Sequence, residues 1–94
     1  MAAIWEKVQR LEGATLHTLA QGRPFKIVEV TTDVVRLVPE EGKRERREVR
    51  RDRIEYIAGL GVDRDKLRKR VLEEYPTSQN TSYYAAIVYE IGQP

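Results

Sequence analysis

The chain has 94 residues, of which 40% are hydrophobic and 34% charged, and its formal net charge is +2 at pH 7. This length suits one compact domain, and the hydrophobic share allows a small core, which excludes wholesale disorder. The absence of cysteine excludes disulfides and thiolate metal sites. No apolar run is long enough to cross a membrane, and charges interrupt the opening MAAIWEKVQR where a signal peptide needs its apolar core. We therefore expect one cytoplasmic domain over residues 1–94 without membrane contact.

The first half of the chain predicts one helix and then a series of strands. Apolar residues recur with the spacing of one helix face before Gly13, which predicts an amphipathic helix over residues 1–12. After this glycine the apolar period changes to two, and turn residues in QGRP, TTD and PEEG separate segments rich in β-branched residues. We therefore expect an antiparallel β-meander over residues 14–51.

The segment RERREVRR has two interpretations. As a fourth strand it would follow the PEEG turn and contribute only Val49 to the core, which suits a solvated sheet edge. Alternatively, residues 44–51 already belong to the helix that follows. The sequence is compatible with both.

Three helices are predicted in the second half, over residues 52–60, 63–75 and 79–91. Asp52 with Glu55 forms a D-x-x-E capping pattern, and Asp63 is placed to cap the next helix. The last helix has the clearest periodic apolar face in the chain. The buried stripe of the middle helix is predicted to be Leu67, Val71 and Leu72.

These elements predict an α+β fold, with a three- to four-stranded antiparallel β-meander packed against the N-terminal and C-terminal helices. Apolar residues fall on both faces of the second strand, so this strand is expected to be central. Most of the core is predicted to come from Trp5, Leu16, Phe25, Ile27, Val28, Val30, Val35, Leu37, Ile57, Leu67, Val71, Ile87 and Val88.

The sequence contains no recognisable catalytic constellation. His17 is the only histidine, and there is no cysteine or second histidine to complete a nucleophile pair or a zinc site. No phosphate loop or dinucleotide fingerprint occurs. Asp33 with Glu41-Gly42-Lys43 is similar to the acidic and E-x-K positions of metal-dependent nucleases, which makes a small nuclease a third-ranked hypothesis. We otherwise expect a protein that is not an enzyme and uses no cofactor or metal.

A cationic run lies between Lys43 and Arg53, where seven basic residues stand against three acidic ones. Twelve of the seventeen basic residues in the chain are arginine, whose planar fork suits phosphate. Such a run can neutralise successive phosphates of a nucleic acid. Alternatively, its acidic residues pair with the arginines across a solvated surface, as in the charge networks of thermophile proteins. The predicted phosphate contacts are Arg44, Arg46, Arg47, Arg50 and Arg51, with Arg68 assisting.

Six uncharged polar residues, from Thr77 to Ser82, precede the last helix. One helix cap needs only one of them. The missing acidic residues suit a phosphate held at a helix N-terminus, and glutamine and asparagine can read adenine edges. A partner protein could use the same neutral surface. The residues predicted to lie near bases or backbone are Gln79, Asn80 and Ser82.

Residues 63–91, DRDKLRKRVLEEYPTSQNTSYYAAIVYEI, resemble the two helices and turn of helix-turn-helix or winged-helix DNA-binding units. The resemblance implies that the second helix enters the major groove with its N-terminal residues toward the bases. In this sequence those residues would be Ser78, Gln79, Asn80, Ser82 and Tyr83. The leading hypothesis is therefore a non-enzymatic nucleic-acid-binding domain with a regulatory role. Its expected ligand is double-stranded DNA in preference to RNA. The alternative is a protein-interaction module or homodimer that uses the charged strand edge and the C-terminal helix.

Overall fold

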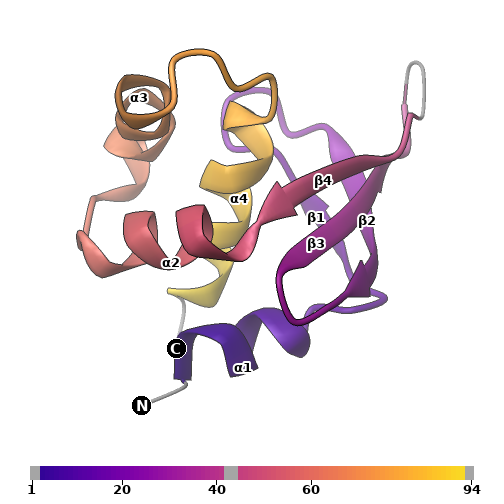
Figure 1. Cartoon of the computed structure of the whole chain (residues 1–94). Helices are drawn as coiled ribbons and strands as arrows, with labels where there is room; N and C mark the ends of the chain where they lie inside the picture. Colours follow the sequence, from indigo (N-terminus) through magenta and orange to yellow (C-terminus); the bar gives the residue numbers. More distant parts are fainter. Residues whose placement is uncertain (1–2, 42–44, 93–94) are drawn as a thin grey trace.

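The computed structural model describes residues 3–41 and 45–92. Its elements follow in the order α1 (Ala3–Gln9), β1 (Thr15–His17), β2 (Pro24–Val30), β3 (Val34–Pro39), β4 (Arg47–Arg50), α2 (Arg51–Gly59), α3 (Arg64–Glu74) and α4 (Thr81–Ile91). The strands form one antiparallel sheet in the order β1-β2-β3-β4 (Figure 1). The predicted α+β fold, a β-meander with helices from both ends of the chain, is confirmed.

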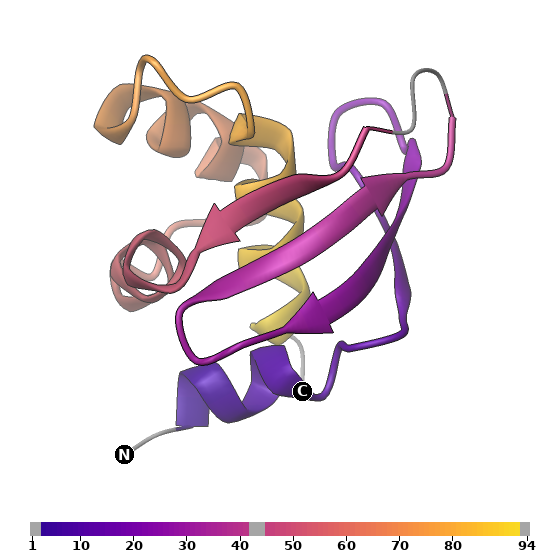
Figure 2. The same cartoon turned by 45° about the vertical axis from the view of Figure 1, so that its right-hand side comes forward.

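Helix α4 runs through the middle of the molecule, with the sheet on one side and α2 and α3 on the other (Figures 1 and 2). Every residue from Tyr84 to Val88 is buried, as is Ile91. A helix that is apolar on nearly all sides belongs inside a core. Helix α1 closes one end of the sheet, where the Trp5 indole N–H donates to the carbonyl oxygen of Thr31 at 3.2 Å.

One face of the sheet packs against the helices, and its other face is exposed in the part of the chain that the structure describes (Figure 2). The prediction that Val28 is a core residue is therefore wrong, since its side chain is 39% exposed. The pairing of β2 with β3 shifts register between Ile27 and Glu29. A bulge of this kind turns two successive side chains outward, so Val28 and Glu29 are both exposed and Val30 is only half-buried. The prediction that the second strand lies inside the sheet is confirmed.

The first helix is shorter than predicted, and the first strand has only three residues. Helix α1 ends at Gln9, because the backbone hydrogen bonds that follow join residues three apart instead of four. One of them runs from the Leu11 N–H to the carbonyl oxygen of Val8 at 2.9 Å. Gly13 then has a positive φ of 86°, which a glycine adopts readily at the end of a helix. Strand β1 ends at His17 because the following residues close a turn, in which the Gly22 N–H donates to the carbonyl oxygen of Thr18 at 2.9 Å.

The fourth strand is confirmed over Arg47–Arg50, and a helix follows at Arg51 without an intervening loop. Val49 is fully buried, as predicted for the one apolar residue of this strand. The predicted capping role of Asp52 is wrong, because Arg50 occupies the N-cap of α2 and the Asp52 carboxylate lies in the first turn.

The last two helices begin and end close to the predicted positions. Asp63 is the N-cap residue of α3, although its side chain makes no capping hydrogen bond, and α4 begins at Thr81, two residues later than predicted. Leu72 was predicted to be buried and is 47% exposed, because the buried stripe of α3 consists of Leu67 and Val71.

The predicted core residues are buried apart from Val28 and Val30. No helix in residues 3–41 and 45–92 has the length and apolar character that a membrane crossing requires. Additional buried residues are Val8, Val49, Ile54, Tyr84, Ala85, Ala86 and Ile91.

Candidate nucleic-acid interface

The arginine run is divided between two faces of the molecule by the alternation of a strand. Within β4, Arg47 lies on the helix-facing side with Val49, whereas Arg50 is exposed. Arg46 precedes the strand and is exposed. Arg44 lies outside the described residues. The four of these arginines that the structure describes therefore do not form a single ribbon.

Two arginines of the run, Arg50 and Arg51, are paired with carboxylates. Arg50 contacts Asp52 at 2.8 Å, and Arg51 contacts Glu55 at 3.3 Å. Arg51 also donates to the carbonyl oxygen of Thr32 at 3.0 Å, and its guanidinium lies 5.0 Å from the centre of the Trp5 ring. These contacts match the alternative interpretation of the run, in which acidic residues satisfy the arginines at the surface.

A ladder of charges crosses the exposed face of the sheet. Arg36 on β3 contacts Glu29 on β2 at 2.6 Å and Glu48 on β4 at 2.8 Å. The hydrogen bonds to Glu48 and Glu29 raise the pKa of the Arg36 guanidinium. The ladder holds one positive side chain between two negative ones, so it offers no concentration of positive charge to a phosphate backbone.

The free edge of β4 is closed by side chains from the start of α4. The Asn80 amide nitrogen donates to the carbonyl oxygen of Glu48 at 3.2 Å, and the Arg50 backbone N–H donates to the Tyr84 hydroxyl at 2.8 Å. The Asn80 amide oxygen accepts from Arg47 Nη1 at 3.3 Å. One residue of the polar segment thus ties α4 to β4, and this edge has fewer open groups for pairing with another strand.

We expect Asn80→Ala to lower the free energy of unfolding by about 1 to 2 kcal/mol, because it leaves a strand carbonyl and an arginine N–H without partners. Gln79 is the matched control: it is the exposed neighbour of Asn80, no side-chain hydrogen bond involves it among the described residues, and Gln79→Ala should stay within about 0.5 kcal/mol. Urea denaturation measures both changes. Equal effects would show that Asn80 has no special role at the strand edge.

Five of the predicted residues meet in one hollow of about 270 Å³, which we call the basic depression. Arg47 enters it from β4 and Arg68 from α3, while Gln79, Ser82 and Tyr83 come from the start of α4. The remaining lining residues are Thr18, Ala20, Gln21, Arg23, Pro24, Pro39 and Glu41.

Arg23 is the functional candidate that the sequence analysis missed. It belongs to the QGRP turn between β1 and β2, a loop that lies near the segment leading into α4 (Figure 1), and it lines the same depression as Arg47 and Arg68. A turn signal explains the glycine and the proline of this tetrapeptide and carries no information about its arginine. Three arginines from separate parts of the chain therefore line one depression, against one described carboxylate, Glu41.

Arg47 is held in position before any ligand arrives. Its guanidinium lies 6.0 Å from the centre of the Tyr83 ring and donates to Asn80. Tyr83 is itself fixed by an edge-to-face contact with Phe25, with ring centroids 5.1 Å apart. The Arg47 Nε atom is buried and finds no hydrogen-bond acceptor within residues 3–41 and 45–92. A buried donor of this kind gains from an anionic partner.

The first turn of α4 offers further donors beside this arginine. Asn80 occupies the N-cap, but no side chain caps the helix. The backbone N–H groups of Thr81 and Ser82 have no acceptor among the described residues. Free N–H groups at a helix start attract anions, so they add to the arginines of the depression.

A second hollow of about 360 Å³ continues from the basic depression along α3. The two share Ala20 and Arg68, and the second adds Arg64 and Lys69 together with Asp65. We call the combined surface the basic track. It carries five basic and two acidic side chains among the residues that line it.

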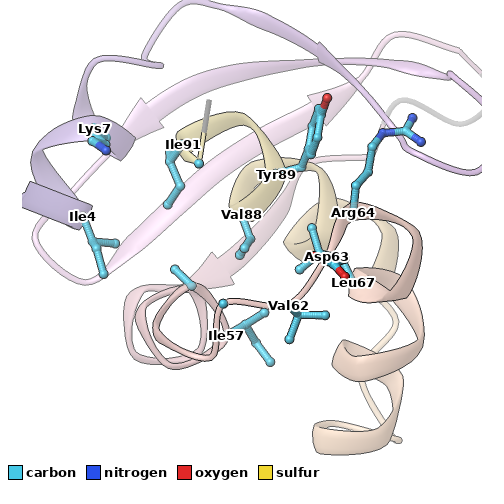
Figure 3. Close-up of a pocket in the computed structure, with 13 residues that line it drawn as sticks. Ile4, Lys7, Ile57, Val62, Asp63, Arg64, Leu67, Val88, Tyr89 and Ile91 are labelled. Carbon is cyan, nitrogen blue, oxygen red and sulfur yellow. The ribbon is translucent and has the colours of Figure 1, made fainter. Parts of the chain in front are cut away.

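A cavity of about 410 Å³ between the four helices has a different character (Figure 3). Its walls are mainly aliphatic, with Ile57, Leu67 and Val88 among them. Arg64, at its rim, lies over the ring of Tyr89, 5.2 Å from its centre. None of the residues predicted to bind nucleic acid lines this cavity.

The carboxylates of the nuclease hypothesis lie at opposite ends of β3. Asp33 precedes this strand and Glu41 follows it, so six residues of extended chain, about 20 Å, separate them. Nowhere in the described ranges do three histidine or acidic residues gather as a possible metal site. Asp33 and Glu41 therefore cannot hold the same metal ion in this fold.

The helix-turn-helix resemblance concerns α3, the turn at residues 75–80 and α4. A recognition helix needs an accessible face along the groove that it enters. Because α4 is buried from Tyr84 to Val88 and again at Ile91, it offers no continuous accessible face for a groove. Comparisons of the chain with family models, with curated proteins and with solved structures found no match. The function of the chain is therefore inferred from the geometry of this interface.

Proposed function

We propose that this domain binds nucleic acid without catalysis, and that it holds double-stranded DNA by its phosphate backbone along the basic track. The observation that carries the proposal is the convergence of Arg23, Arg47 and Arg68 from three separate elements on one depression. Arg36, Arg50 and Arg51 pair with carboxylates elsewhere on the surface, so they do not add to the positive charge of this depression.

The chemistry of the track suits phosphate. Arginine offers a planar fork of N–H donors that matches a phosphate group, and neither Arg23 nor Arg68 has a side-chain partner in the described ranges. The free N–H groups of the first turn of α4 add donors without charge. Contacts of this type determine position on the backbone and carry little sequence information, so binding to many sequences is expected.

Duplex DNA is favoured over a long single strand by the scarcity of aromatic rings on the track. Proteins that follow single strands stack successive bases on several aromatic side chains. Tyr83 is the only aromatic residue among those that line the two hollows. A backbone-directed mode therefore fits this surface better than a stacking platform.

Fluorescence anisotropy of a labelled random duplex of about 20 base pairs tests the proposal. Three phosphate contacts correspond to a slope of log K against log salt of about −3, which is roughly a 60-fold loss of affinity between about 50 mM and 200 mM salt. Binding with this salt dependence is the expected result. Absence of binding even at about 50 mM salt would refute the proposal.

An assembly role for the β4 edge has less support. An outward carbonyl oxygen and an outward N–H of this strand are bonded to Asn80 and Tyr84, and the exposed sheet face carries the ladder of charges at Arg36. Size measurement of the protein in the same buffer, without DNA, tests the alternative: a stable dimer that lacks affinity for DNA would replace our proposal with assembly.

A further inference from the structure

We infer that the basic depression receives one unpaired nucleotide of the bound DNA, so that the preferred ligand is a duplex with a single-stranded end. This inference deepens the proposed function and depends on it. It rests on the shape of the depression and on the kinds of side chain that line it.

The depression is a pocket, whereas a backbone contact needs only a surface. Its volume of about 270 Å³ lies near the lower end of the range of small-molecule sites. A base within a duplex is covered on both faces by its neighbours and shows a protein only its edges. A ligand from DNA can therefore fill this pocket only with a nucleotide that has left the stack.

The lining residues provide for each part of a nucleotide. Tyr83 supplies an aromatic ring for the face of a base, and Gln21 and Gln79 supply amides that can pair with its edge. The Arg47 guanidinium lies over this ring, 6.0 Å from its centre, close enough to hold the phosphate of the same nucleotide. Arg23 lies on the same lining and can hold the next phosphate.

The number of rings limits the site to one base. Tyr83 is kept in place by Phe25 at 5.1 Å, and the residues that line the rest of the basic track include no second aromatic side chain. The neighbouring hollow contributes Leu72 and the cations of α3. The flanking DNA is therefore held by its phosphates, in agreement with a duplex that presents one unpaired nucleotide.

The experiment compares the dissociation constants of a blunt duplex and of the same duplex with a short single-stranded 3′ or 5′ extension, at one salt concentration. We expect one of the extended duplexes to bind about tenfold more tightly than the blunt duplex, the effect of one base stacked on a ring. Tyr83→Phe should keep this preference because the ring remains, and Tyr83→Leu should remove it. Gln79→Ala, at an exposed position that leaves the Tyr83 contact with Phe25 intact, should weaken the preference as well.

Thermal unfolding of each variant shows whether it is folded. If Tyr83→Leu is unfolded, the loss of preference is tested with Gln79→Ala instead. Equal binding of blunt and extended duplexes would overturn the inference and leave the proposed function intact. No binding of any duplex would overturn both. If a low concentration of a free deoxynucleoside monophosphate were enough to displace the extended duplex, the pocket would be a mononucleotide site and the inference would also fail.

Discussion

Joint replacement of Arg23, Arg47 and Arg68 by alanine is expected to weaken duplex binding at low salt by on the order of 100- to 1,000-fold. The salt slope should fall by about three, because each lost phosphate contact removes roughly one from it. These three side chains line one depression, so their loss removes the centre of the basic track. Fluorescence anisotropy across a range of salt concentrations measures both quantities.

A matched variant separates position from net charge. Lys7, Arg10 and Arg50 are exposed and line neither hollow of the basic track. Their joint replacement by alanine removes the same number of positive charges, three, from other parts of the surface. We expect this variant to keep most of the salt slope. If both triple variants lost the same slope, binding would depend on overall charge, and the assignment of the track would be wrong.

Ile27→Ala is expected to lower the free energy of unfolding by about 2 to 5 kcal/mol, since it removes a fully buried side chain and leaves a cavity. The adjacent change, Val28→Ala, should cost less than about 1 kcal/mol because this side chain lies on the exposed face of the sheet. Urea denaturation of the two variants under identical conditions gives the comparison. A large cost for Val28→Ala would indicate that the exposed face is covered in solution, for instance by a second copy of the chain.

The different fates of these neighbours show how far local patterns reach. Both residues belong to a β-branched run that predicts a strand, and the strand is present. The bulge that turns Val28 outward depends on the register with β3, which no property of the run itself reveals. The same limit explains Leu72, whose place beside a buried valine on α3 suggested a wider apolar stripe than the neighbouring helices cover.

The candidate site was predictable only in part. The residue types around the start of α4 indicated an anion-binding helix start, and Gln79, Ser82 and Tyr83 do line the basic depression. Asn80 is instead engaged at the edge of β4, a role that becomes visible only when the strand lies beside the helix. Ser78 is similarly engaged, since its hydroxyl accepts the Asn80 N–H at 3.1 Å.

The sequence alone was sufficient to determine the class of fold, the β-meander and the order of helices, because periodicity and turn residues act over a few neighbouring positions. It also predicted that Val49 would be the single core residue of β4. Only the tertiary structure decided which arginines share a surface. Arg47 and Arg50 have similar local surroundings in the sequence, yet the strand turns one toward Tyr83 and the other toward Asp52. Arg23 joins Arg47 through packing between distant segments, and charge carries no local signal of such a meeting.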